Sequence, residues 1–151
     1  MDGVRSSLSA EAVVQVEAEV SRLHSAREGQ DRTELALSSV EVYRILVSAV
    51  RDNAKIPREV SLLDYAGFRY DAYRRASPVR WDDMVLAASF ARQTWNTLLP
   101  RASSSPAAEA FESALTDMEH AAAQRDDSLA TASVKTELDL VDEFETFFSG
   151  R

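Results

Sequence analysis

Arg69 and Glu137 are charged residues that fall within otherwise apolar helix faces. Arg69 interrupts the face formed by Leu62, Tyr65, Tyr73 and neighbouring apolar residues on one expected helix, and Glu137 lies at the centre of the apolar face of another. An unpaired charge in such a place is costly, so each side chain needs a partner, water or a ligand. Counted at the helical rise per residue, the two lie within roughly one turn of the same height. We therefore predict that Arg69 and Glu137 form a buried ion pair.

The sequence leaves three interpretations of this pair open. In the first, it is a structural ion pair, tied by the hydroxyl of a nearby tyrosine. In the second, Arg69 lies along a helix edge and its long side chain reaches water. In the third, the pair anchors a ligand in the middle of the bundle. The ligand-binding residues would then be Tyr65, Arg69, Tyr73 and Glu137.

The helix that carries Arg69 also has a polar face, which contains Asp64, Gly67 and Asp71. The helical wheel places these residues opposite the tyrosines, so we expect them to face solvent. Two arginines follow at the end of this helix, Arg74 and Arg75, where cations compensate the helix dipole. The net charge of −8 repels a phosphate backbone. We therefore expect no nucleic-acid partner.

Metal-binding and catalytic chemistry have little support in this chain, which contains two histidines and no cysteine. A di-metal carboxylate bundle needs two Glu-x-x-His motifs and two further inward glutamates. His24 lies at a helix edge, and His120 lies opposite the apolar stripe of Phe111 and Leu115, so both histidines should face water. The sequence has no glycine-rich phosphate loop and no inward histidine to act as a base. We predict no metal site, no cofactor and no enzymatic activity.

Composition indicates one ordinary helical domain. The chain has 151 residues, of which 45% are apolar and 28% charged, with four glycines and four prolines. No apolar run is long enough for a membrane span. The first residues lack the layout of a signal peptide. The compartment therefore stays open: cytoplasmic if the chain is complete, periplasmic if it is a mature form that has lost its signal.

Apolar spacing, capping residues and prolines together predict six helices. Ser9 and the pairs Ser77-Pro78 and Ser105-Pro106 are typical helix starts, whereas 25–32 and 100–104 are expected to be loops. The expected helices span 8–27, 33–52, 57–76, 78–99, 106–125 and 128–148.

We expect an all-α fold, an antiparallel four- to five-helix bundle with an additional N-terminal helix. Residues 1–32 would form that amphipathic helix and a polar linker, and 33–151 the helical bundle, within a single domain overall.

The helix expected over 78–99 has a second, smaller apolar stripe beside its main one. This stripe contains Val79, Leu86 and Phe90, and it is either covered by another helix or exposed to a partner. We expect the protein to be a non-catalytic, soluble interaction module that binds a protein partner, and self-association is the simplest case. The alternative is a small-ligand- or metal-binding bundle, a sensor or carrier with a mid-bundle polar pocket.

Overall fold

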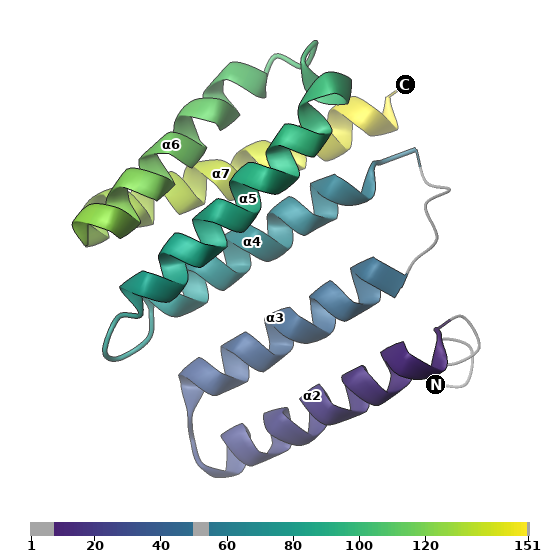
Figure 1. Ribbon diagram of the computed structural model, residues 1–151, viewed down its shortest axis with the longest axis vertical. Helices are drawn as coiled ribbons and strands as arrows, with labels where there is room; N and C mark the ends of the chain where they lie inside the picture. The colour runs from purple at the N-terminus through teal and green to yellow at the C-terminus, as the bar shows by residue number, and fades with distance from the viewer. Residues whose placement is uncertain (1–7, 50–54, 151) are drawn as a thin grey trace. The chain divides into compact units, whose positions relative to one another are not determined.

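Six α-helices account for nearly all of residues 8–49 and 55–150, which the computed structural model describes, and no strand occurs among them (Figure 1). This confirms the all-α class and the helical bundle. None of the helices in these two ranges is long and apolar enough to cross a membrane. The helices are α2 (Ala10–Glu28), α3 (Arg32–Ala49), α4 (Arg58–Arg74), α5 (Trp81–Ala102), α6 (Ala108–Gln124) and α7 (Asp127–Ser149).

The chain divides into two compact units, residues 1–53 and residues 54–151. In the first unit, α2 and α3 pack against each other. The structure therefore groups α3 with α2, whereas the sequence suggested a division after residue 32. The division into an N-terminal helix with linker over 1–32 and a helical bundle over 33–151, within a single domain overall, stays a prediction.

In the second unit, each of four helices packs against two others. Helix α4 contacts α5 and α7, and α6 contacts the same two helices. Three fully buried rings lie between them: Trp95 from α5, Phe111 from α6 and Phe144 from α7, with ring centroids 4.8 to 5.3 Å apart. Burying each such ring contributes roughly 1.5–3 kcal/mol, which makes this cluster the centre of the apolar core.

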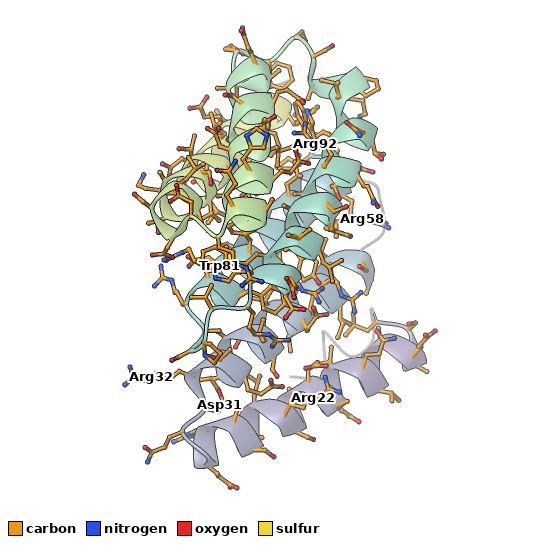
Figure 2. All side chains as sticks on the ribbon, turned by 60° about the vertical axis from the view of Figure 1, so that its left-hand side comes forward. Arg22, Asp31, Arg32, Arg58, Trp81 and Arg92 are labelled. Carbon is orange, nitrogen blue, oxygen red and sulfur yellow. The ribbon has the colours of Figure 1, made fainter. Side chains whose placement is uncertain are left out.

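Arg92 connects α5 to α6 beside this core (Figure 2). Its guanidinium donates to both carboxylate oxygens of Glu119, at 3.0 and 2.9 Å, and to Thr116 Oγ1 at 3.1 Å. It also pairs with Glu112, which in turn accepts a 2.5 Å hydrogen bond from Trp95 Nε1. One arginine thus binds three successive turns of α6 and links them to the buried indole.

Side-chain caps begin three of the helices. Ser9 accepts a hydrogen bond from the amide of Ala12 at 3.1 Å, and Asp126 accepts one from the amide of Leu129 at 3.0 Å. Asp31 caps α3 in the same way. These bonds satisfy amide groups that the first helical turn leaves without a carbonyl partner. The predicted cap at Ser9 is confirmed.

The predicted ends of the fourth helix were wrong at both sides. Ser77-Pro78 was expected to start this helix, but α5 begins at Trp81, and the Ser77-Pro78 peptide is cis within the preceding turn. At the other end, Pro100 lies inside the last turn rather than in a loop. Proline removes one amide donor, and the helix nevertheless closes with a 2.8 Å bond from Ser103 N to Leu99 O.

Candidate functional site

Arg69 lies between two tyrosines of its own helix. Its Nε donates a 2.8 Å hydrogen bond to the Tyr73 hydroxyl, and its Nη1 donates one to the Tyr65 hydroxyl. Its guanidinium carbon is 5.7 Å from the Tyr65 ring centroid and 5.4 Å from that of Tyr73. The two tyrosines are four residues before and after Arg69, so all three share one face of α4.

The environment of Arg69 keeps it charged. Partial burial would by itself lower the pKa of the Arg69 guanidinium, but the hydrogen bonds and electrostatic interactions with Tyr73 and Tyr65 outweigh it, and the pKa is raised. Both tyrosines are almost fully buried. The predicted association of Tyr65, Arg69 and Tyr73 is therefore present as a fixed cation between two phenol rings.

Two contacts join this tyrosine–arginine cluster to α5 and to the turn before it. The ring of Phe90 meets the Tyr65 ring edge-on, with centroids 5.5 Å apart. The Arg80 guanidinium lies 4.9 Å from the centroid of the Tyr73 ring. Cation–π contacts of this kind contribute about 0.5–1 kcal/mol where they are exposed to solvent. These contacts stabilise the packing of α4 on α5.

Glu137 does not belong to the Arg69 cluster. It lies on α7 with no exposed surface, and neither of its carboxylate oxygens has a hydrogen-bond partner. The predicted ion pair between Arg69 and Glu137 is therefore wrong, and the four residues expected to form one ligand site are divided between two places. Tyr65, Arg69 and Tyr73 lie together, whereas Glu137 packs against a different part of α4.

The residue that Glu137 packs against is Gly67. A Cβ atom built on Gly67 would collide with Oε2 of Glu137, and it would lie 2.6 Å from Cδ2 of Leu138. Gly67 is buried, although the helical wheel placed it on the solvent face. Because α4 packs against both α5 and α7, part of its polar-looking face lies inside the bundle.

Burial dominates the electrostatics of Glu137. The pKa of its carboxyl group is raised well above the ordinary value, first because burial disfavours the charged form and second because of the negative charge of Asp64. The folded protein therefore favours the neutral acid, which can donate one hydrogen bond as well as accept them. Glu137 can therefore bind or release a proton within the buried contact between α4 and α7.

The predicted interaction surface is only partly on one helix. Leu86 and Phe90 lie on α5 with 67% and 36% of their surface exposed. Val79 is half-buried and lies in the turn before α5, because this helix begins later than expected. Sequence analysis missed Val85, which is 43% exposed beside Leu86. Sequence analysis could have found Val85 from its position directly before Leu86 in the expected helix.

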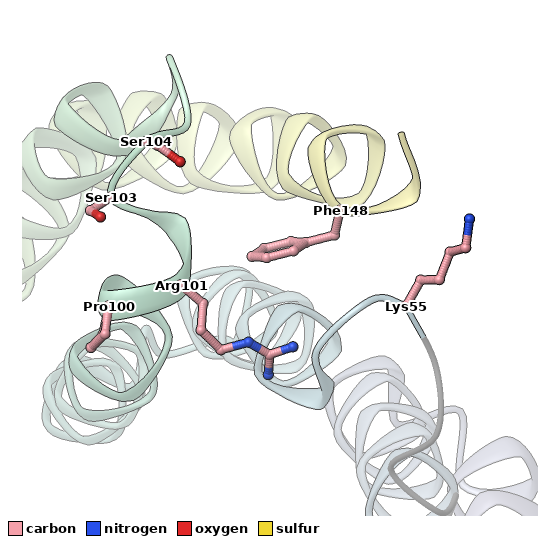
Figure 3. Close-up of a pocket in the computed structure, with 6 residues that line it drawn as sticks. All are labelled: Lys55, Pro100, Arg101, Ser103, Ser104 and Phe148. Atoms are coloured by element: carbon pink, nitrogen blue, oxygen red, sulfur yellow. The ribbon is translucent and has the colours of Figure 1, made fainter. Parts of the chain in front are cut away.

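A cavity of about 380 Å³ that the sequence did not indicate lies where α5 and α7 end (Figure 3). Arg101 and Lys55 contribute two cations, and the Arg101 guanidinium carbon is 5.8 Å from the Phe148 ring centroid. No acidic residue lines the cavity. Its lining comes from segments far apart in the chain, so no local motif could reveal it. The lining residues are Lys55, Pro100, Arg101, Ser103, Ser104 and Phe148.

Within residues 8–49 and 55–150, no three histidine, cysteine, aspartate or glutamate side chains come together in a way that could hold a metal ion. Comparisons of the chain with models of protein families, with curated proteins and with solved structures give no match.

Proposed function

We propose that this protein is a non-catalytic interaction module that associates with a second copy of itself through the exposed face of α5. The observation that carries the proposal is the exposure of Leu86, Val85 and Phe90, which are 67%, 43% and 36% accessible on one helix. Single exposed apolar residues are common, but three within six positions concentrate apolar surface in the first turns of one helix. Val79, the third residue of the predicted stripe, lies in the turn before α5.

The same face continues along α5 without an acidic residue, and its one exposed cation is Arg101 in the last turn. After Asp83 the helix carries no acidic residue, and its one half-buried arginine, Arg92, is bound to α6. The exposed positions 86, 90, 93, 97 and 100 are spaced by three and four, so they form one stripe along the helix. The exposed uncharged residues are Val85, Leu86, Ser89, Phe90, Gln93, Asn96, Thr97, Leu99 and Pro100.

The lack of acidic residues on α5 after Asp83 favours a second copy as the partner. Two chains that each carry a net charge of −8 repel each other, and a face without acidic groups lowers this repulsion at the contact. The centres of protein interfaces are likewise depleted of charged residues. The α5 face meets both conditions over most of the length of the helix.

The proposal takes α4, α5, α6 and α7 as an antiparallel four-helix bundle. Short connections between successive helices and the packing of α4 and α6 on both α5 and α7 support this arrangement. In such a bundle each helix keeps one outer face. The outer face of α5 is then available to the partner while its inner face carries Trp95.

Sedimentation velocity over a range of concentrations tests the proposal. The wild-type chain should sediment as a dimer at high concentration, and Leu86→Glu should shift it to monomer because the substitution places an acid in the contact. Val14→Glu is the matched control, since Val14 is 65% exposed on α2. This control should leave the dimer intact. A wild-type chain that stays monomeric at every concentration would refute self-association.

The second expected function, a ligand- or metal-binding pocket in the middle of the bundle, is not favoured by a specific observation. It requires Glu137 and the cluster of Tyr65, Arg69 and Tyr73 to face one common ligand. Glu137 instead packs on Gly67, and Arg69 donates to its two tyrosines.

A further inference from the structure

We infer that the contact between α4 and α7 is a proton-dependent switch, closed while Glu137 is a neutral carboxylic acid and loosened when Glu137 ionises. This inference is independent of the proposed self-association, because it concerns the interior of the second unit. It rests on how Glu137 is buried, on the close approach of α4 at Gly67, and on the charges around the carboxyl group.

The first observation is that no group among residues 8–49 and 55–150 compensates a charge at Glu137. The side chain is fully buried, and both carboxylate oxygens lack a hydrogen-bond donor. Taking a carboxylate out of water without donors or a counter-ion is among the most expensive changes in a protein interior. A neutral acid in the same place costs much less.

The second observation is that α4 approaches Glu137 too closely for the site to rehydrate without movement. Gly67 is the residue of contact, and even a methyl group there would overlap Oε2 of Glu137 and crowd Leu138. A carboxylate needs several water molecules around it. Ionisation therefore favours a state in which α4 and α7 separate enough to admit them.

The third observation concerns α4, the helix that faces Glu137. Asp64 lies close enough for its negative charge to oppose ionisation of Glu137, which adds to the effect of burial. Two of the three cations of α4 are engaged elsewhere: Arg69 with Tyr65 and Tyr73, and Arg74 with an aspartate of its own helix. The third, Arg58, is the first residue of the helix, nine positions before Gly67.

The remaining neighbours of Glu137 supply no counter-charge either. On α7 itself, Lys135 is exposed and pairs with Asp139 at 2.5 Å. On α6, which also packs against α7, Glu112 and Glu119 bind Arg92 of α5. The other titratable residues of α6 are exposed; they are Glu109, Asp117 and His120.

The direction of the pH effect follows from proton linkage. An unfolded glutamate ionises at about pH 4.3, whereas the folded protein holds the Glu137 proton to a higher pH. Between these two values the folded state binds one proton more, so folding becomes less favourable as pH rises. The loss of folding stability is absent below the pKa of glutamate in the unfolded chain. It is complete above the pKa of Glu137 in the folded protein.

Denaturant unfolding of the full chain at a series of pH values tests the inference. Compared with Glu137→Gln, the unfolding constant of the wild-type chain should grow by up to tenfold per pH unit above about pH 4.3. Glu143→Gln, on an exposed position of α7, is the matched control and should follow the wild-type profile. A constant difference between wild type and Glu137→Gln at all pH values would overturn the inference.

Carboxyl carbon-13 NMR of the wild-type chain with labelled glutamate provides a readout that needs no variant to fold. One glutamate carboxyl should titrate well above the others, and Asp64→Asn should move this titration to lower pH. Amide exchange in α4 and α7, compared between wild type and Glu137→Gln at each pH, should show wild-type protection falling as the late carboxyl ionises. Glutamates that all titrate together would refute the switch.

Discussion

Gly67 of α4 and Glu137 of α7 share one space: the Glu137 carboxyl group lies where the side chain of any other residue at position 67 would begin. This explains a glycine in the middle of a helix, where it costs about 1 kcal/mol relative to alanine. The close approach of two helices and the burial of an unpaired acid are thus parts of the same contact.

Gly67→Ala should destabilise the second unit by about 1–3 kcal/mol, because the added methyl group overlaps Glu137 and Leu138. The better helix propensity of alanine offsets only part of this cost. Urea unfolding measures the change. Gly150→Ala is the matched control, since a Cβ there would meet its nearest atom at an ordinary 3.5 Å.

A double-mutant cycle can assign the clash to Glu137. If the two residues compete for the same space, Gly67→Ala should cost less in a Glu137→Ala background than in the wild-type chain. Equal costs in both backgrounds would mean that Leu138 alone opposes the methyl group.

Arg92→Met should lower the stability by about 1 kcal/mol, because it removes the bonds to Glu112, Thr116 and Glu119 while keeping most of the apolar stem. Arg92 is 20% exposed, so solvent screens these bonds in part, and the effect should shrink in high salt. Lys135→Met removes an exposed pair on α7 and should cost only about 0.3 kcal/mol. Equal losses in the two variants would contradict a network role for Arg92.

Tyr70→Phe should cost about 1 kcal/mol near neutral pH, because the buried Tyr70 hydroxyl donates a 3.0 Å bond to the carbonyl of Met118. Burial raises the pKa of Tyr70 above the ordinary value, and Arg74 offsets this only partly. The folded state therefore keeps this proton after the unfolded chain has lost it, and the wild-type advantage should shrink above about pH 10. Urea unfolding of wild type and Tyr70→Phe below and above that pH measures this change. A stability difference that stays the same at both pH values would contradict the buried hydrogen bond.

Asp126→Ala should cost about 1 kcal/mol, because it removes the 3.0 Å side-chain bond to the amide of Leu129 at the start of α7. Asp126→Asn keeps an acceptor in the same place and should restore most of the stability. The thermal midpoints of the three proteins provide the comparison. A loss of similar size for asparagine would show that charge, and not the capping bond, is what matters.

Sequence alone determined the helical class and the start of several helices, because these depend on neighbours in the chain. The caps at Ser9, Asp31 and Asp126 lie within three residues of the amides they bind. The grouping of Tyr65, Arg69 and Tyr73 also follows from spacing on one helix. The start of α5 was misplaced because Ser77-Pro78 has the composition of a helix start and lies in a turn.

Tertiary structure decided the partner of each buried charge. Helical rise brought Arg69 and Glu137 to similar heights, but height leaves the rotation of each helix about its axis undetermined. Because α4 packs on two helices, its glycine-bearing face receives Glu137 while Arg69 turns to its own tyrosines. The spacing of residues in a sequence shows which of them share a helix face, and only the packing of the helices shows which faces meet.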